Sequence, residues 1–283
     1  MPAPAAALPN RDQADLWNNA AGRTWVEMQA LLDRMLAPFA EHLIGAAWPG
    51  EGASVLDVGC GAGATTLAMA RRVGPAGGCL GVDISGPLIE AAKARALEAG
   101  LAQATFLEAD AQTHAFEPGA FDAVISRFGV MFFDDPPAAF ANLRRATRPG
   151  GALTFVAWRG PEENPFMTTA ARAAAPLLPP QPRPAPDAPG QFAFADGARV
   201  RGILEAAGWS DIDVSPLEVP GEVAEADLMA YVTRLGPVGL ALRDMDEAAR
   251  ARVAEALNAA FTPFVHDGVA RFTSAVWIVR ARA

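Results

Sequence analysis

The chain has 283 residues, 51% of them hydrophobic, which is enough to bury a sizeable core in one elaborated domain or in a domain plus a cap. Its formal net charge is −9 and Lys93 is its only lysine, so nearly all of its positive charge comes from arginine. Unless those arginines cluster on one face, this composition argues against DNA or RNA as a partner. No apolar run approaches the roughly 18 residues that cross a bilayer, and the opening MPAPAAALP lacks a basic leader region, so we expect no membrane span and a cytoplasmic location.

The first predicted elements are helical. Residues 15–23 suggest a short helix and a turn, and from 24 to 44 apolar residues recur with a period close to 3.6, which predicts one amphipathic helix. Its apolar positions are Trp25, Met28, Leu31, Leu32, Met35, Leu36, Phe39 and Leu43. We expect residues 1–50 to form an N-terminal helical cap. Apolar residues at this spacing ordinarily pack in the core. The alternative is that Trp17 or Trp25 lines the pocket of a substrate.

The run 55–63 (VLDVGCGAG) places a buried strand, the carboxylate of Asp57 and three glycines in one strand-to-helix turn, and residues 64–72 predict the helix that follows. Gly59, Gly61 and Gly63 let the turn take positive φ and let a ligand approach the backbone. The run also satisfies the dinucleotide pattern. Asp57 argues against that reading, because it would repel a pyrophosphate and attract an ammonium or sulfonium group. The turn therefore predicts a cationic, nucleoside-type cofactor.

Two further apolar runs end in acids. Residues 79–83 end at Asp83, where a doubly wound sheet holds a ribose, and residues 104–110 end at Asp110. Taken alone, each acid could instead be an ordinary surface carboxylate or a helix cap. Because three successive strands present an acid at the same sheet edge, we predict a ligand site there in an α/β, doubly wound sheet.

The rest of the chain predicts more strands and helices. The proline-rich stretch 176–186 favours extended geometry, either as a strap near the site or as a solvent linker. Residues 212–219 and 274–280 predict strands; the predicted helices are 197–207, 226–235 and 247–261. We expect a core at 51–160, a Pro-rich insertion at 161–195, and the rest of the sheet at 196–283 with inserted helices at about 223–264.

The two cysteines, Cys60 and Cys79, lie in or beside predicted strands and have neither CxxC nor metal-ligand spacing. We expect both to be small apolar fillers and no metal to be bound.

In these motifs the chain resembles the class I S-adenosylmethionine-dependent methyltransferases, and among them small-molecule enzymes of the ubiquinone/menaquinone C-methyltransferase type. VLDVGCGAG is similar to their first motif, GVDIS to the acidic second, EADAQTH to the third, and LRRATRPGGALTFVAW to the segment with the fifth strand. Residues 121–127 resemble the fourth strand of the family, and residues 152–158 correspond to its fifth strand. The resemblance spans about residues 55–158. It implies a Rossmann-like, mostly parallel sheet with an antiparallel last strand, and helices inserted over the acceptor site.

Carried over residue by residue, the resemblance implies a cofactor site for S-adenosylmethionine. Gly59, Gly61 and Gly63 would wrap the methionine part and Asp57 would support its amino group. Asp83 would bind the ribose hydroxyls, and Ile84 would pack against the adenine. Asp110 and the backbone of Ala111 would contact the edge of the adenine ring. Arg127 and Phe128 would lie near the cofactor or acceptor.

The implied reaction is an in-line transfer of the sulfonium methyl to a small-molecule acceptor with a carbon, oxygen or nitrogen nucleophile. His114 is the first candidate for a general base, with an ordinary loop role as its alternative. Family members that methylate base nitrogens or glutamine carry an Asn/Asp-Pro-Pro-aromatic motif, but the fourth strand here ends in Ser126-Arg127-Phe128, and we assign no catalytic role to the similar stretches at 134–137 and 164–166.

Two other functions stay open: a nicotinamide-dependent oxidoreductase on a related sheet, and a non-catalytic cofactor-binding protein. Against a short-chain dehydrogenase, the only tyrosine, Tyr231, is followed four residues later by Leu235 instead of lysine. A homodimer also stays open.

Overall fold

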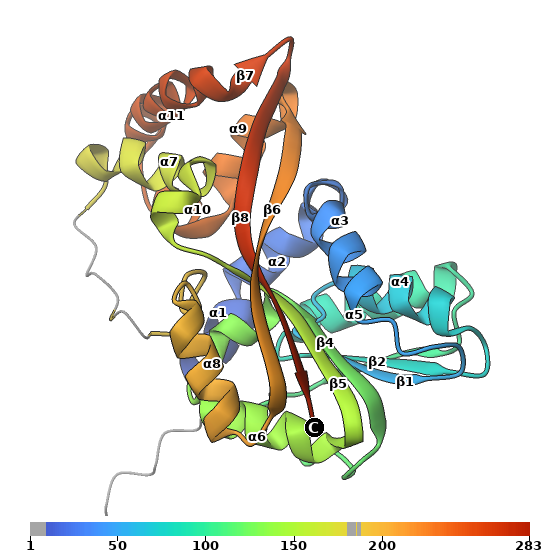
Figure 1. Ribbon diagram of the computed structural model, residues 1–283. Helices are drawn as coiled ribbons and strands as arrows, with labels where there is room; N and C mark the ends of the chain where they lie inside the picture. Colours follow the sequence, from blue (N-terminus) through green and yellow to red (C-terminus); the bar gives the residue numbers. More distant parts are fainter. Residues whose placement is uncertain (1–9, 180–184, 186–187) are drawn as a thin grey trace, which may run out of the picture.

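The computed structural model describes residues 10–179, 185 and 188–283, and in this part of the chain an eight-stranded sheet has helices on both faces (Figure 1). The strands are β1 (Ser54–Val58), β2 (Gly78–Asp83), β3 (Ala104–Glu108), β4 (Phe121–Arg127), β5 (Thr147–Trp158), β6 (Ser210–Ala224), β7 (Val265–His266) and β8 (Val269–Arg282). Their order is β3-β2-β1-β4-β5-β8-β6, and β7 pairs with β8.

The first five strands of this order pair in parallel, whereas β8 pairs antiparallel with β5, β6 and β7. The predicted doubly wound, mostly parallel sheet with an antiparallel last strand is therefore confirmed. Since β1, β2, β3 and β4 are parallel neighbours, their carboxyl ends meet at one edge, where open α/β sheets bind ligands.

Helices cover the sheet from both sides: α3, α4 and α5 pack on one face, and α6 and α8 on the other (Figure 1). The α-helices are α1 (Arg11–Asn18), α2 (Ala20–Glu27), α3 (Gln29–Ala46), α4 (Ala64–Val73), α5 (Gly86–Glu98), α6 (Pro136–Ala146), α7 (Pro165–Ala174), α8 (Gly197–Ala206), α9 (Glu225–Arg234), α10 (Gly236–Leu242) and α11 (Glu247–Phe261). Short 3₁₀ turns are η1 (Gly129–Phe132), η2 (Pro161–Glu163), η3 (Ala175–Leu177) and η4 (Thr262–Phe264). Within the described ranges, no helix has the length and apolar character needed to cross a membrane.

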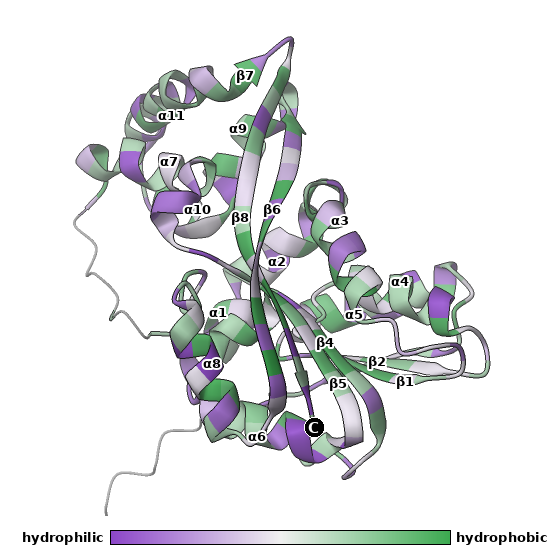
Figure 2. Ribbon diagram, viewed as in Figure 1, coloured by the Kyte–Doolittle hydropathy of each residue, from purple (hydrophilic) through white to green (hydrophobic). Residues whose placement is uncertain are grey.

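The central strands form the core because they are apolar on both faces, as expected of parallel strands between two helix layers. Leu56, Val124 and Phe155 have no exposed surface, and Figure 2 shows the middle of the sheet as largely hydrophobic. Cys60 and Cys79 are free and buried, and burial raises the pKa of both thiols well above the usual value. Cys79 packs in the hydrophobic core of the sheet, whereas Cys60 Sγ lies at the glycine turn and donates to Gly61 O at 3.6 Å.

The predicted single helix over 24–44 is wrong in one respect, because the structure breaks it into α2 and α3 at Met28. Met28 has φ −99° and ψ 8°, outside helical geometry. The break lets α2 pack against α5 while α3 packs against β4, β5 and β6. One residue outside the helix leaves the apolar period almost unchanged, which is why the periodicity missed the break.

Strands β6 and β8 extend beyond the rest of the sheet and carry a second hydrophobic core. The partners of β5 on β8 are residues 276–282, so residues 269–275 pair with β6 instead and rise away from the sheet (Figure 1). The far part of this two-stranded ribbon packs with α7, α9, α10 and α11 around Phe166, Leu257 and Phe261. We call these four helices and the ribbon the cap.

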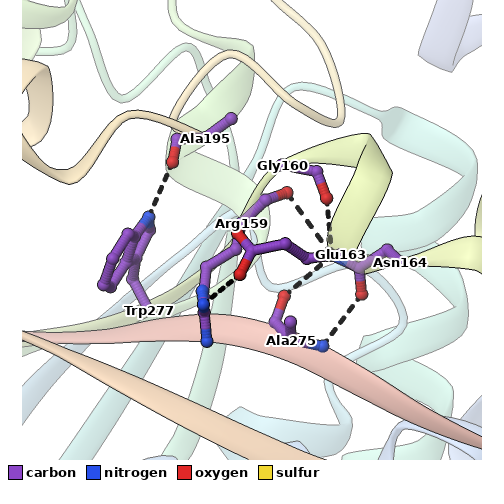
Figure 3. Close-up of polar contacts among 7 residues, drawn as sticks. All are labelled: Arg159, Gly160, Glu163, Asn164, Ala195, Ala275 and Trp277. Carbon is purple, nitrogen blue, oxygen red and sulfur yellow. Dashed lines mark hydrogen bonds and ion pairs between the residues drawn. The ribbon is translucent and has the colours of Figure 1, made fainter.

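Asn164 joins the cap to the sheet at the point where β5 ends. Its Nδ2 donates to Ala275 O at 2.9 Å and to Gly160 O at 3.1 Å, while its Oδ1 accepts from Ala275 N at 2.9 Å (Figure 3). The side chain thus continues the β5–β8 ladder by one residue. Beside it, Arg159 pairs with Glu163 and lies over the Trp277 ring. Because Asn164 is 1% exposed and fully used in these contacts, its role is structural.

The proline-rich prediction falls partly outside the described residues, since 180–184 and 186–187 are not described. Just before them, residues 175–177 form η3, and just after them Gly190 N donates to Met131 O of η1 at 3.1 Å. The chain therefore returns to the sheet beside the end of β4.

We expect Asn164→Ala to destabilise the protein, because the backbone N–H of Ala275 loses its buried partner, whereas Ala275 O keeps a hydrogen bond from Arg159 N at 3.1 Å. An unpaired buried polar group costs about 1–3 kcal/mol, so the free energy of unfolding should fall by a similar amount. Urea unfolding followed by circular dichroism measures the loss. The exposed Asn19 provides the control Asn19→Ala, because among the described residues its Nδ2 donates only to Asp15 O, one helical turn earlier. Equal stability of the two variants would contradict the role given to Asn164.

Candidate active site

The predicted site residues gather at the carboxyl edge of β1 to β4. Asp57 is the fourth residue of β1, Asp83 ends β2, Asp110 lies two residues after β3, and Arg127 ends β4. Because neighbouring parallel strands end side by side, one ligand can reach residues from all four. A metal has no equivalent place, since no three His, Cys, Asp or Glu side chains of residues 10–179, 185 and 188–283 lie close enough to hold one.

Asp57 is a buried carboxylate with one oxygen unpaired. Thr66 Oγ1 of α4 donates to Oδ2 at 2.6 Å, whereas Oδ1 has no hydrogen-bond partner among the described residues. Burial raises the pKa of Asp57 to about 7, and the charge of Asp83 adds to the rise, while Thr66 and Arg127 oppose it. A buried acceptor without a donor costs free energy, so this oxygen is prepared to receive a cationic donor.

Two glycines of the turn are required for different reasons. Gly59 has φ +65°, and a Cβ there would lie 2.5 Å from Gly129 Cα, so the turn and η1 meet backbone to backbone. Gly61 has φ +55°, and a Cβ there would meet nothing within 4 Å. The space next to Gly61 is therefore open, and a ligand can approach the backbone there. Gly129 was not singled out from the sequence, because only the fold shows that it touches Gly59.

Asp83 holds the turn and keeps acceptor capacity. Its Oδ2 accepts from Gly61 N at 2.8 Å and its Oδ1 from Ser85 N at 2.9 Å. Burial raises its pKa, and the three backbone N–H groups of Gly61, Ile84 and Ser85 oppose that rise. Each carboxylate oxygen has two lone pairs, so both can also accept a hydroxyl of a sugar.

At the end of β3 the structure brings in a residue from the N-terminal segment. Asp110 Oδ1 accepts from Gln112 N at 2.9 Å and from Asn10 Nδ2 at 3.0 Å. Asn10 is 6% exposed, and its Oδ1 accepts from Asp134 N at 2.8 Å. The next residue, Ala111, is buried, and its carbonyl accepts from Asn142. Asn10 could not be foreseen because it lies 100 residues from Asp110.

The connection between α1 and α2 docks on the residues that follow Asp83. Asn18 Nδ2 donates to Ile84 O and its Oδ1 accepts from Gly86 N, both at 2.9 Å, while Ser85 Oγ donates to Trp17 O at 2.7 Å. A Cβ at Gly22 would lie 1.9 Å from Trp17 O, so the approach leaves no room for a side chain. These contacts hold the N-terminal helices over the edge of β2.

Aromatic rings form two groups near the end of β4. Trp17 makes edge contacts with Trp25 at 5.5 Å and with Phe132 at 5.7 Å between ring centroids. Phe128 instead stacks on Trp158 at 4.4 Å. Phe128 has φ +66°, a strained conformation for a bulky residue and one that clusters at functional sites. Phe132 was missed by the sequence analysis, because nothing local links it to Trp17.

Arg127 and His114 lie in different surroundings. Arg127 Nη1 donates to Leu36 O of α3 at 3.3 Å, and burial lowers its pKa while Asp57 and Asp33 oppose the change. The His114 ring packs edge-on against Phe116 at 4.7 Å, and its backbone N donates to Asp110 O. The structure therefore places Arg127 beside Asp57, and His114 beside Asp110.

Comparison with known proteins agrees with this geometry. A family model described as a methyltransferase domain matches residues 55–151. Nocamycin O-methyltransferase of Saccharothrix syringae is 39% identical over 116 residues, 41% of each chain. The 2-phytyl-1,4-naphtoquinone methyltransferase of Trichormus variabilis is 35% identical over 125 residues, 43% of this chain and 54% of that protein. This chain thus matches about half the length, or less, of these curated relatives.

A solved structure has a fold similar to that of nearly the whole chain. Phosphoethanolamine N-methyltransferase 2 of Haemonchus contortus, solved in complex with S-adenosyl-L-methionine, aligns with 98% of this chain and 60% of that chain, with a TM-score of 0.60 and 17% identity. At this identity the likeness concerns the fold alone.

We expect Gly59→Ala and Gly61→Ala to affect different properties. Both place a side chain at positive φ, which costs about 1–2 kcal/mol of stability. Gly59→Ala also forces a Cβ into Gly129 Cα, so a further cost of about 1–3 kcal/mol is expected. Gly61→Ala projects its methyl into the ligand space, so it should weaken cofactor binding more than stability. Thermal unfolding and calorimetric titration of each variant separate the two effects, and the same pattern in both variants would contradict the assignment.

Proposed function

We propose, from the premise that residues 55–151 form a class I methyltransferase domain, that this chain transfers the methyl group of S-adenosylmethionine to a small-molecule acceptor. One observation carries the proposal: Asp57 Oδ1 is buried and unpartnered at the end of β1, beside a glycine turn with open space at Gly61. The cofactor carries an ammonium group that can donate to this oxygen. A pyrophosphate at the same place would be repelled by it.

The residues present fit this cofactor along its length. In our assignment Gly59, Gly61 and Gly63 wrap the methionine part and Asp57 receives its ammonium group. Asp83 accepts from the ribose hydroxyls with its free lone pairs. Ile84 covers the adenine face, and Asp110 Oδ2 with the backbone of Ala111 receives the adenine edge. Arg127 faces the methionine end.

The acceptor would approach from the side of the N-terminal helices and the cap. Trp17, Trp25 and Phe128 are our candidates for its walls, and we add Phe132 because it contacts Trp17. The relatives are named for an O-methyltransferase and for a quinone methyltransferase. We therefore propose an oxygen or carbon nucleophile on a small organic molecule, with nitrogen as the third choice.

The residues contribute mainly by positioning. Bound S-adenosylmethionine supplies an electrophilic methyl group, so the chain must hold the acceptor in line with it and exclude water. Positioning of this kind can supply roughly 7–11 kcal/mol of the barrier reduction. A general base is needed only for an acceptor that must lose a proton, where it adds about 10²- to 10⁴-fold. His114 stays our candidate for that base.

We also propose that different parts of the chain bind the cofactor and select the acceptor. Residues 51–160 bind the cofactor, while residues 1–50 and the helices inserted at about 223–264 select the acceptor. A cytoplasmic location and a homodimer remain proposals.

We expect calorimetric titration to show binding of S-adenosylhomocysteine and none of NAD. Incubation with S-adenosylmethionine and a panel of phenols, quinol precursors, amines and carboxylates should then release S-adenosylhomocysteine with at least one acceptor. Tight binding of NAD without binding of S-adenosylhomocysteine would favour an oxidoreductase. Binding of S-adenosylhomocysteine without turnover on any acceptor would favour a non-catalytic protein.

We expect the affinity for S-adenosylhomocysteine to rise with pH up to about 7. Below its pKa of about 7, Asp57 is protonated in the free protein, and its proton must leave before the carboxylate can pair with the ligand ammonium. Affinity should therefore fall by up to tenfold for each pH unit below 7 and change little from 7 to 8. Titrations at several pH values measure the slope. Asp57→Asn should bind more weakly at pH 7.5 and lose the slope, and a slope that persists in this variant would assign it to another group.

A further inference from the structure

We propose that Asp33 and Arg95 are positioning residues that set cofactor affinity by holding the glycine turn against α3. The inference rests on the proposed function, since the turn is taken to cradle S-adenosylmethionine. Neither residue belongs to a motif, and they lie 62 positions apart. Their shared contact with the turn is visible only in the fold.

Arg95 of α5 contacts both the glycine turn and α3. Arg95 Nη1 donates to Ala62 O at 2.5 Å, and Ala62 lies between Gly61 and Gly63. Arg95 Nη2 donates to Asp33 Oδ2 at 2.6 Å. The two side chains are only 23% and 29% exposed, so water screens the pair less than it screens a surface ion pair. The guanidinium of Arg95 therefore joins the glycine turn to α3.

Asp33 is itself held in place. Gln29 Nε2, one helical turn earlier on α3, donates to Asp33 Oδ2 at 2.8 Å. One turn later on the same helix, Leu36 O accepts from Arg127 Nη1 at 3.3 Å. Thus α3 is attached to the site at two points, through Arg95 to the glycine turn and through Arg127 to the end of β4. Both attachments end beside the position assigned to the methionine part of the cofactor.

Charges alternate in this region. Two acidic residues, Asp57 and Asp33, and two arginines, Arg127 and Arg95, lie in this region, and Arg127 interacts electrostatically with the other three. Removal of Asp33 would leave two half-buried arginines without their shared counter-charge beside a cationic ligand. We therefore expect Asp33 to favour cofactor binding through its charge as well as through its hydrogen bond to Arg95.

The turn is fixed from two sides by these contacts. Gly61 N donates to Asp83 on one side, and Ala62 O accepts from Arg95 on the other. Loss of Arg95 leaves the fold of the sheet intact but lets the turn sample other conformations, so binding must order it again at an entropic cost. Because Arg95 does not touch the reacting atoms, the loss should raise KM and leave kcat almost unchanged.

Lysine cannot replace Arg95 fully. The guanidinium presents separate N–H donors to Ala62 O and to Asp33, whereas an ammonium is a single point of charge on a flexible stem. Arg95→Lys should therefore restore part of the affinity that Arg95→Gln loses. Partial rescue of this kind distinguishes a positional role from simple packing.

The test is calorimetric titration of S-adenosylhomocysteine into the full chain carrying Arg95→Gln, Arg95→Lys, Asp33→Asn or both Asp33→Asn and Arg95→Gln. We expect Arg95→Gln to raise Kd by about 10-fold or more and Asp33→Asn to raise it by about 3- to 10-fold. The Kd of the double variant should be close to that of Arg95→Gln, because the two residues act as one unit. Steady-state kinetics should show kcat within about threefold of the wild type. The matched control is Lys93→Gln, also on α5, whose ammonium pairs with exposed Glu90, and its Kd should stay within twofold.

Several outcomes would overturn the inference. These are a folded Arg95→Gln variant with Kd within twofold of the wild type, fully additive effects in the double variant, or a fall in kcat with KM unchanged. If Arg95→Gln does not fold, Asp33→Asn decides, and an unchanged Kd there overturns the proposal. Wild-type protein that does not bind S-adenosylhomocysteine overturns the proposed function itself, an outcome distinct from equal binding by wild type and variant.

Discussion

The site is organised around a carboxylate that the fold removes from water. Asp57 sits in β1 with one oxygen bonded to Thr66 and the other unpaired, and burial raises its pKa to about 7. Such a group destabilises the free protein as pH rises toward 7, because the unfolded chain can hold it charged in water. Its presence is best explained by a ligand whose positive charge offsets that cost. The close backbone contact of Gly59 with Gly129 and the support of the turn by Asp83 keep the surroundings of this carboxylate fixed.

The remaining elements close the site from outside the sheet. Asn10 and Asn18 attach the N-terminal helices to the ends of β3 and β2, and Arg95 and Arg127 attach α3 to the glycine turn and to β4. Each attachment joins residues far apart in sequence through a side chain that meets a backbone group or a carboxylate. The proposed cofactor site is therefore formed jointly by the sheet and by helices that precede it in the chain.

Most of the sheet could be predicted from the sequence, since buried parallel strands have apolar runs and the turn after β1 needs glycine. The strands at Val55, Cys79 and Phe121, the helix beginning at Glu247, and the acids Asp57, Asp83 and Asp110 follow from such local signals. Met28 could not be foreseen as a helix break, because one nonhelical residue hardly alters the apolar period. Asn10, Gly129 and the pair Asp33 and Arg95 depend on contacts between distant segments, which no local pattern encodes. The match of residues 55–151 to a methyltransferase domain was predictable because it rests on motifs of consecutive residues.

Helix α3 joins the cap to the sheet, because its first half packs in the hydrophobic core of the cap and its second half packs in the core of the sheet. The β6–β8 ribbon and the Asn164 bridge connect the same two parts. The core of the cap includes Leu31, Leu32 and Met35 of α3, and the same helix contacts β4, β5 and β6. A change in the packing of the cap helices can therefore shift α3 on the sheet. Any exchange of cap helices must therefore preserve the apolar face of α3 against which they pack.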